Sequence, residues 1–576
     1  MPLTRLHENR ETMNLSDQLS AVVADELAQC SVTDAVISPG LHSGLLAAAL
    51  YDHPLLRLHV RIDERSAGFL ALGLARAGDR PAVVTCTSGT AAANLYPAVL
   101  EARHARVPLI VVTTDRRPMW RGTGANQTTD QTRMFGQATS FFAELDSVPG
   151  DAATTRYWRS VLSRAAAEAA AGGPVQINLT LPDPLENTAQ PGGPDRPRPE
   201  SGERRPAVRI TRTPPQPEPL EVPARGVVVA GDAAADPQAA VAFAEQAGWP
   251  LLAEPQSGAR QGPNAVTTYG YLLAHPGFRA LAAPELVVSV GRPGVNLALL
   301  DFLGSAPRLV VVDPGHDWAD PARTATRVVS RLGAPRQPES DPDWLRLWQD
   351  ADKAALETLD RTLDEGGLTE ARVARDLTAA LPSGSLLFAG SSMPVRDVER
   401  TMRPRSDLRV LANRGLSGID GAVSSALGAA YAHQRSGAGR AVALLGDLSL
   451  LHDQNGLLTG AEPERPDLTL VVINNDGGGI FSMTPRTAPS DCFETVFGTP
   501  HGVRVTDVAR AAGWPCTRAG SVAEVLAAVR EGGPRLVEVI TDREANGAFH
   551  RALAEAVAQG VTEALTRTAA GSAATD

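Results

Sequence analysis

The stretch AVALLGDLSLLHDQNGLLTGAEPERPDLTLVVINNDGG, residues 441–478, carries the strongest indication of fold in the chain. An apolar run ends at Gly446-Asp447, a helical segment follows, and a second apolar run ends at Asn474-Asn475. This order predicts a strand–helix–strand crossover of about 30 residues. Because the two strands of such a crossover are parallel, both end at the same edge of the sheet, where ligands bind.

These two strand ends predict a metal site. Asp447 can supply a carboxylate oxygen, Asn475 an amide oxygen, and the glycine-rich turn that starts at Gly477 a main-chain carbonyl. Mg²⁺ is usually held by a few protein oxygens, with phosphate supplying others. Taken singly, a helix-capping Asp and an Asn-Asn-Asp-Gly turn are more common than metal ligands, so the prediction depends on both halves together.

Apolar runs alternate with Ala/Leu-rich helical stretches in three blocks, residues 15–187, 225–336 and 369–553. This alternation predicts an α/β fold of three doubly wound parallel-sheet domains. Between and after the blocks we expect a Pro-rich linker at 188–224, a helical connector at 337–368 and a frayed tail at 554–576. The central block has GDAAAD instead of GxGxxG, which favours a structural role or a vestigial nucleotide site.

Composition excludes several classes of function. The formal net charge of −11 over 576 residues argues against nucleic acid or an anionic membrane as partner. No apolar run approaches the ~20 residues that span a bilayer, and the polar N-terminus predicts no export signal. Four cysteines without a CxxC pair suit buried thiols in a reducing cytoplasm. The only lysine, Lys353, lies in a charged helical pattern, which argues against Schiff-base enzymes and P-loop NTPases.

A second segment, RIDERSAGFLALGLARA at 61–77, places Glu64 between a strand-like run and an amphipathic helix. Taken by itself, Glu64 could be an exposed glutamate at the start of a helix, a position that the helix dipole favours. Together with TCTSGTAAANLYPAVLEA at 85–102 and residues 441–478, however, it resembles the thiamine-diphosphate-dependent family that contains pyruvate decarboxylase and acetohydroxyacid synthase. The resemblance implies thiamine diphosphate and Mg²⁺ or Mn²⁺ as cofactors, with Glu64 as the catalytic acid on the aminopyrimidine ring. The family's usual GDG is Gly446-Asp447-Leu448 here.

The segments GTGANQT (122–128), GSSMPVRDV (390–398), NRGLSGIDG (413–421) and NNDGGGIFSM (474–483) resemble more closely the branch of this family that acts in menaquinone biosynthesis. That resemblance implies small-molecule substrates, with decarboxylation of 2-oxoglutarate and addition of the succinyl carbanion to isochorismate. It also implies a homodimer or homotetramer, because the family binds its cofactor between the first block of one subunit and the third block of another.

The same resemblance implies roles for individual residues. Arg396 and Arg414, with Ser392, would bind the donor and the cofactor, since two guanidiniums can each make paired hydrogen bonds to a carboxylate. Ile419 would hold the cofactor in its bent form. The residues beside or lining the active centre would be Asn126, Gln127, Ile480 and Phe481, with Gly446 near the diphosphate. Surface ion pairs for the arginines and a core position for Ile419 remain alternatives.

The acceptor side departs from the family pattern. Leu41 and His42 stand where the family has serine and arginine, and Asn296 stands where a basic residue is expected, whereas Arg116 matches. A protonated His42 could replace part of the missing charge. Because of this departure, a related carboligase that uses a different acceptor remains an alternative function. A non-catalytic homologue is a further alternative, against which Glu64 and the Asp447/Asn475 pair argue.

Overall fold

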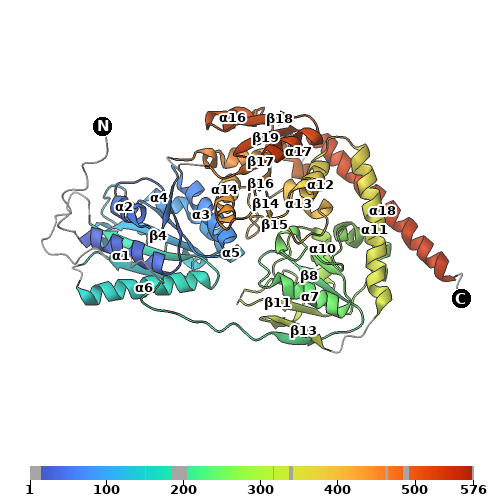
Figure 1. Cartoon of the computed structure of the whole chain (residues 1–576), viewed down its shortest axis with the longest axis horizontal. Helices are drawn as coiled ribbons and strands as arrows, with labels where there is room; N and C mark the ends of the chain where they lie inside the picture. The colour runs from blue at the N-terminus through green and yellow to red at the C-terminus, as the bar shows by residue number, and fades with distance from the viewer. Residues whose placement is uncertain are drawn as a thin grey trace. The chain divides into compact units, whose positions relative to one another are not determined.

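The computed structural model describes residues 15–148, 151–182, 204–315, 317–336, 341–460, 465–483 and 492–573. The chain divides into two compact units (Figure 1). Unit 1 comprises Met1–Arg212, Gly415–Ser436 and Asp453–Pro466, and unit 2 comprises Thr213–Arg414, Gly437–His452 and Asp467–Asp576. No helix among the described residues is long and apolar enough to cross a membrane.

Unit 1 contains one six-stranded parallel sheet of order β2-β1-β3-β4-β6-β5. Its strands are β1 (Asp34–Ile37), β2 (Arg57–Val60), β3 (Ala82–Cys86), β4 (Leu109–Arg116), β5 (Phe141–Asp146) and β6 (Val175–Leu181). Its helices are α1 (Leu15–Gln29), α2 (Gly44–Asp52), α3 (Glu64–Gly78), α4 (Thr90–Asn94), α5 (Tyr96–Ala105), α6 (Ala152–Ala170) and α14 (Ala422–Arg435). Apolar side chains of α1, α2 and α6 share one core with the sheet.

Helices α3 and α14 lie side by side although some 350 residues separate them in the sequence (Figure 1). A Cβ added at Gly73 would lie 2.1 Å from the Ser425 carbonyl oxygen, and one at Gly428 would lie 2.1 Å from the Leu70 carbonyl oxygen. Only glycine allows this reciprocal main-chain approach. The contact fixes the helix that begins at Glu64.

Unit 2 contains two larger parallel sheets and a two-stranded one, which consists of β13 (Leu332–Arg336) and β7 (Glu218–Glu221). The five-stranded sheet, β12-β11-β10-β8-β9, consists of β8 (Gly226–Ala230), β9 (Leu251–Ala253), β10 (Leu286–Val290), β11 (Leu309–Val312) and β12 (Ala325–Val329). The six-stranded sheet, β15-β14-β16-β17-β19-β18, consists of β14 (Ser385–Ala389), β15 (Leu408–Leu411), β16 (Ala441–Gly446), β17 (Leu468–Asn474), β18 (Cys516–Ala519) and β19 (Arg535–Ile540). Apart from Gly446 at the end of β16, the central strands β8, β10, β16 and β17 are buried, which explains their continuous apolar sequences.

The helices of unit 2 connect these strands: α7 (Pro237–Ala247), α8 (Tyr269–Ala274), α9 (Pro276–Leu281), α10 (Leu297–Gly304), α11 (Pro342–Glu365), α12 (Glu370–Ala380), α13 (Met393–Thr401), α15 (Asp447–His452), α16 (Val505–Ala511), α17 (Val522–Glu531) and α18 (Arg543–Ala573). Strands β16 and β17 pair in parallel from Ala441↔Leu468 to Gly446↔Ile473, which confirms the predicted crossover. The predicted fold class, α/β with doubly wound parallel sheets, is confirmed.

The expectation of a frayed tail after residue 554 is wrong, because α18 continues to Ala573. Leu553, Val557 and Val561 lie four residues apart and are buried in a core with residues of α11. The two helices run side by side (Figure 1). An apolar stripe with this spacing stabilises a helix through packing despite the small polar residues around it.

Part of the expected linker at 188–224 also has regular structure. Residues up to 203 lie outside the described part of the chain, but β7 (Glu218–Glu221) pairs in parallel with β13 (Leu332–Arg336). Leu220 is 2% exposed and belongs to the core of the five-stranded sheet. The high proline content of this segment is typical of a linker, but the buried Leu220 attaches it to the core of unit 2.

Candidate active site

The carboxyl edge of the six-stranded sheet in unit 2 carries four of the predicted site residues. Ser392, Arg414, Asp447 and Asn475 follow β14, β15, β16 and β17, which are consecutive in the order β15-β14-β16-β17. Ser392 adopts a φ of 74° at the start of α13, the helix that carries Arg396. Parallel strands place these ends at one edge, so the sheet gathers residues that are up to 83 positions apart in the sequence.

Asp447 is a buried carboxylate in a fixed orientation. Its side chain accepts hydrogen bonds from the Leu448 N–H at 2.6 Å and the Gly477 N–H at 2.9 Å. Burial raises the pKa of Asp447, although these donors and His501 act in the opposite direction. A carboxylate held in a buried site is best compensated by a cation. The φ of +136° at Gly477 allows the turn that brings its N–H to Asp447.

The adjacent residues Asn474 and Asn475 differ in one decisive contact. Each donates its Nδ2–H to a buried glutamate, Asn474 to Glu538 at 2.8 Å and Asn475 to Glu370 at 2.9 Å. The Asn474 Oδ1 accepts from the Asp476 N–H, whereas the Asn475 Oδ1 is buried without a hydrogen-bond partner among the described residues. Buried acceptors are normally satisfied. The unpaired oxygen of Asn475 therefore suits a metal ligand.

The chemistry of this edge matches a hard cation. Asp447, the Asn475 Oδ1 and a carbonyl of the turn at Gly477 are oxygen donors of the kind that Mg²⁺ and Mn²⁺ accept. Within the described ranges, no group of three or more His, Cys, Asp or Glu side chains could hold a metal ion by itself. The residues thus fit a cation whose remaining ligands come from a phosphate and water.

His501 is a contact of this site that sequence reasoning missed. Its Nδ1 accepts from the Val503 N–H at 2.9 Å, so the proton of the neutral ring lies on Nε2. The Nε2 lies 3.3 Å from the Asp447 Oδ2, to which it donates. No motif joins two residues 54 positions apart, and therefore the sequence offered no indication of this contact.

Arg396 and Arg414 form a pair of like charges beside this edge. The Arg396 Nη1–H donates to the Ser392 carbonyl at 2.7 Å. Burial, and next the positive charge of Arg414, lower the pKa of Arg396. The hydrogen bonds found for the two guanidiniums among the described residues go to main-chain carbonyls, Arg396 to Ser392 and Arg414 to Gly294. A bound dicarboxylate would compensate both charges.

A buried glutamate supports the turn that contacts Arg414. The Glu254 Oε1 accepts from the N–H groups of Gly294 at 2.7 Å and Val295 at 2.6 Å. The Gly294 carbonyl accepts from the Arg414 Nη2 at 3.1 Å. Asn296, next in this turn, caps α10 by accepting from Ala298 N–H at 2.9 Å, and its Nδ2 donates to Glu399. The polar groups of Asn296 are therefore committed to the fold.

Glu254→Gln should change the pH dependence of stability. Burial raises the pKa of Glu254 from 4.5 to about 7. Because the folded-state pKa lies above the unfolded one, the stabilisation is complete at low pH and is lost as the pH rises through about 7. Glutamine cannot ionise, so the Tm of the variant relative to wild type should increase between about pH 5 and 8. Thermal unfolding across this range measures it, and a constant Tm difference would contradict the assignment.

The carboxyl edge of the unit 1 sheet carries three of the predicted site residues, Glu64, His42 and Arg116. Glu64 follows β2, His42 follows β1 and Arg116 ends β4, and together with β3 these strands are consecutive in the order β2-β1-β3-β4. Glu64 is half-buried as the first residue of α3, whose N-cap is Asp63. Burial, and next the charge of Glu64, raise the pKa of the Cys86 thiol at the end of β3. The Glu64 carboxylate therefore lies near that strand end.

Gln127 contacts the loop after β3. Its Nε2 donates to the Ser88 carbonyl at 3.1 Å, and the Ser88 Oγ donates to the Gln127 carbonyl at 2.8 Å. Asn126 and Gln127 are both exposed. His42 is buried, with Nε2 at 2.8 Å from the Asp115 carbonyl oxygen, so that nitrogen is not available to a substrate. Leu41, in contrast, is 79% exposed.

The three predicted apolar site residues, Ile419 as support of the bent cofactor and Ile480 and Phe481 as walls of the active centre, lie in different surroundings. Ile419 is half-buried in unit 1. Ile480 and Phe481 belong to a 3₁₀ turn, Gly479–Met483, of unit 2, and the Phe481 ring lies edge-on to Phe497 at 5.4 Å between centroids. This turn begins two residues after Gly477, whose N–H donates to Asp447, so it lies close to the Asp447 and Asn475 strand ends.

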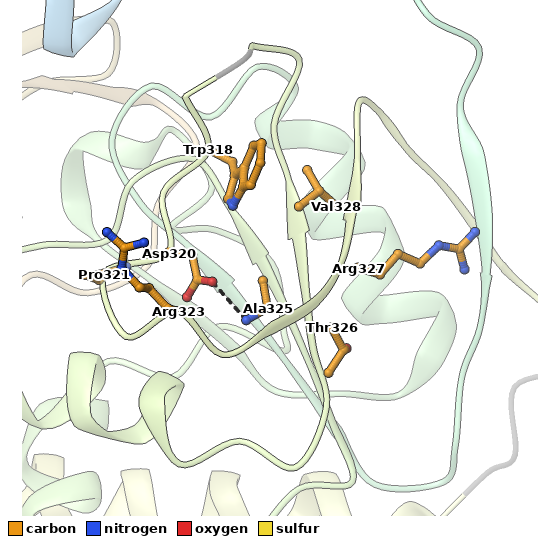
Figure 2. Close-up of a pocket in the computed structure, with 8 residues that line it drawn as sticks. All are labelled: Trp318, Asp320, Pro321, Arg323, Ala325, Thr326, Arg327 and Val328. Carbon is orange, nitrogen blue, oxygen red and sulfur yellow. Dashed lines mark hydrogen bonds between the residues drawn. The ribbon is translucent and has the colours of Figure 1, made fainter.

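A pocket of about 600 Å³ lies elsewhere in unit 2, at the edge of the five-stranded sheet (Figure 2). Its lining consists of Trp318, Asp320, Pro321, Arg323, Ala325, Thr326, Arg327 and Val328. The Asp320 carboxylate accepts from the Thr324 and Ala325 N–H groups, and Arg327 pairs with Glu218. None of the predicted site residues lines this pocket, so it is separate from the candidate active site.

Comparison with known proteins gives the class. Three family models match successive parts of the chain: the N-terminal TPP-binding domain of thiamine pyrophosphate enzymes at residues 17–134, the middle domain at 220–389 and the C-terminal TPP-binding domain at 391–539. The fold, the two strand-end sites and these matches define a thiamine-pyrophosphate-dependent enzyme.

Full-length relatives show to which family of thiamine-pyrophosphate-dependent enzymes the chain belongs. The chain is 53% identical over 95% of its length to the 2-succinyl-5-enolpyruvyl-6-hydroxy-3-cyclohexene-1-carboxylate synthase of Thermobifida fusca, all of which it covers. It is 43% identical, over 95% of its length and 99% of the relative, to the enzyme of that name from Saccharopolyspora erythraea. It is 39% identical to the enzyme of that name from Chloroflexus aurantiacus, over 94% of its own length and 97% of the relative. The chain belongs to the family of 2-succinyl-5-enolpyruvyl-6-hydroxy-3-cyclohexene-1-carboxylate synthases, which confirms the resemblance found in the sequence.

Proposed function

We propose that the chain decarboxylates 2-oxoglutarate and adds the succinyl unit to isochorismate, giving 2-succinyl-5-enolpyruvyl-6-hydroxy-3-cyclohexene-1-carboxylate in menaquinone biosynthesis. The observation that carries the proposal is the meeting, at one sheet edge, of metal-type oxygens at Asp447 and Asn475 with the paired guanidiniums of Arg396 and Arg414. The full-length relatives carry the name of this product.

Thiamine diphosphate, when bound, supplies the electron sink that makes loss of carbon dioxide from a 2-oxo acid possible. The residues of the chain bind and orient the cofactor, its metal ion and the substrates. Asp447, the Asn475 Oδ1 and a carbonyl at Gly477 would hold Mg²⁺ or Mn²⁺ against the diphosphate. A Cβ at Gly446 would meet no atom within 4 Å, which leaves room for a phosphate beside the strand end. Ser392 would contact the cofactor from the neighbouring strand end.

Glu64 would exchange a proton with the aminopyrimidine N1′ of the cofactor, a role that requires a carboxyl at the start of α3. Asn126 would contact the cofactor and Gln127 the substrate. Ile419 would support the bent cofactor, while Ile480 and Phe481 would limit water at the reacting carbon. Arg116 and His42 would face the acceptor, with Arg116 supplying the positive charge for its carboxylates.

We further propose a cytoplasmic homodimer or homotetramer that needs neither nucleic acid nor membrane. The four cysteines are free, which suits a reducing compartment. In a dimer, Glu64 of one subunit would reach the cofactor that Asp447 of the other subunit holds through its metal. Size-exclusion chromatography with light scattering would distinguish dimer, tetramer and monomer, and a monomer with full activity would contradict this part.

The direct test is a two-substrate reaction. Purified protein with thiamine diphosphate, Mg²⁺, 2-oxoglutarate and isochorismate should consume both substrates in equal amounts and release carbon dioxide. A related carboligase with another acceptor is the second candidate, favoured by Leu41 and by the commitment of Asn296 to capping α10. Donor turnover that leaves isochorismate unchanged would select that candidate. No turnover of either substrate would favour a non-catalytic homologue.

Donor binding should depend on the paired guanidiniums. Arg396→Gln and Arg414→Gln should each raise the KM for 2-oxoglutarate by about 10- to 100-fold, since a charge-assisted hydrogen bond contributes about 1.5–3 kcal/mol. Arg400→Gln is the matched control, because Arg400 lies one turn further along α13 and pairs with Asp397. Steady-state kinetics measure the effect. Equal KM increases in all three variants would contradict a specific donor site.

A further inference from the structure

Asn474 and Asn475 raise the question of what makes one of two neighbouring asparagines a metal ligand. Both are buried, at 8% exposure, and both donate Nδ2–H to a glutamate. Only Asn475 keeps a buried amide oxygen without a hydrogen-bond partner among the described residues. An asparagine amide can turn over, exchanging its oxygen and nitrogen, so a contact must determine which atom faces the metal position.

Glu370 makes that contact. It is the first residue of α12, follows the N-cap Thr369, and is 3% exposed. Its Oε1 accepts from the Asn475 Nδ2 at 2.9 Å and from the Thr541 Oγ1 at 2.9 Å. In its ionised form, the Glu370 carboxylate only accepts hydrogen bonds. If the Asn475 amide were reversed, its oxygen would face the Glu370 oxygen, and two buried acceptors would meet without a proton between them.

We propose that Glu370 is a positioning residue for the metal: it fixes the Asn475 amide so that the Oδ1 faces the cation. The inference rests on the proposed function in that Asn475 must be a metal ligand. Glu370 acts from the start of α12, 105 positions before Asn475 in the sequence, and its role is to orient the ligand. Partners of this kind orient metal ligands, and their loss typically lowers metal affinity by about 10- to 100-fold.

The effect should appear in metal binding without any turnover. Mn²⁺ can be titrated into the full-length protein with thiamine diphosphate and no substrate, with free Mn²⁺ followed by electron paramagnetic resonance. Glu370→Leu should weaken Mn²⁺ binding by about 10- to 100-fold. Glu370→Gln should retain near wild-type affinity, because its Oε1 can still accept from both Asn475 and Thr541. Thr541→Val is the matched control, since it removes only the second donor.

Two results would overturn the inference. One is wild-type Mn²⁺ affinity in Glu370→Leu, and the other is Glu370→Gln being as weak as Glu370→Leu, which would make charge rather than orientation the cause. If Asn475→Ala leaves Mn²⁺ binding unchanged, Asn475 is not a metal ligand and the proposed metal site is wrong. If Asn475→Ala weakens binding and Glu370→Leu does not, only the positioning role fails.

Should Glu370→Leu not fold, as judged by circular dichroism, an exchanged pair keeps the inference testable. Asn475→Asp alone places two carboxyl groups at the present 2.9 Å contact. Adding Glu370→Gln restores a donor facing an acceptor while the ligand oxygen remains. The double variant should therefore bind Mn²⁺ more tightly than Asn475→Asp alone. Equal affinity of the two would overturn the positioning role.

Discussion

Glu64→Gln should lower kcat by about 10²- to 10⁴-fold, the contribution typical of a positioned acid–base group. Glutamine keeps the size of the side chain and the start of α3, but it cannot exchange a proton with the aminopyrimidine ring. Binding of thiamine diphosphate and metal should change far less than turnover. Carbon dioxide release from 2-oxoglutarate measures the effect, and isothermal titration of the cofactor measures binding.

Asp63→Asn is the matched control for this variant, because it makes the same carboxyl-to-amide change one residue earlier. The Asp63 side chain accepts from the Arg65 N–H at 2.8 Å as the N-cap of α3, and asparagine caps helices equally well. Its kcat should stay close to wild type. Comparable losses in both variants would show that the start of α3, and not the proton of Glu64, limits turnover.

Asp447→Asn should abolish metal-dependent binding of thiamine diphosphate, with a loss of at least about 100-fold. The change removes the negative charge at the metal position, and altering an outer partner alone typically costs about 10- to 100-fold in affinity. It also puts an amide nitrogen in the place of an oxygen that accepts from the Gly477 or Leu448 N–H. Isothermal titration of thiamine diphosphate with saturating Mg²⁺ measures the loss.

The control for Asp447→Asn lies at the next strand end. Asp476 accepts from the N–H groups of His501 and Gly502 through one oxygen, and it adopts a φ of 60°. Asparagine tolerates this conformation and keeps the accepting oxygen. Asp476→Asn should therefore bind the cofactor normally. A similar loss in both variants would mean that the turn, rather than the Asp447 charge, supports binding.

Much of this site could be predicted because sheet geometry is regular. A strand that ends at Gly446-Asp447 and a parallel strand that ends at Asn474-Asn475 must finish at the same edge, and the register of β16 and β17 confirms it. The resemblance of the flanking segments to known enzymes then supplied the family, which the full-length relatives confirm. The roles of individual residues remain predictions that the variants above test.

Contacts between distant segments could not be predicted. Glu370 contacts Asn475 across 105 positions and His501 contacts Asp447 across 54, and neither contact has a fixed spacing or motif. Such pairs depend on how helices and loops pack around the sheet. The continuation of α18, in contrast, was readable from the four-residue spacing of Leu553, Val557 and Val561, which the small polar residues nearby obscured.

The most direct measurement is a crystal structure of the protein with thiamine diphosphate and Mg²⁺. We expect one cation at about 2.0–2.1 Å from an Asp447 carboxylate oxygen and from the Asn475 Oδ1, with a carbonyl of the turn at Gly477, diphosphate oxygens and water as its further ligands. The Glu64 carboxyl of a neighbouring subunit should lie within hydrogen-bond distance of the aminopyrimidine N1′. A cation bound without Asp447 and Asn475, or a cofactor ring out of reach of every Glu64 in the assembly, would contradict the account.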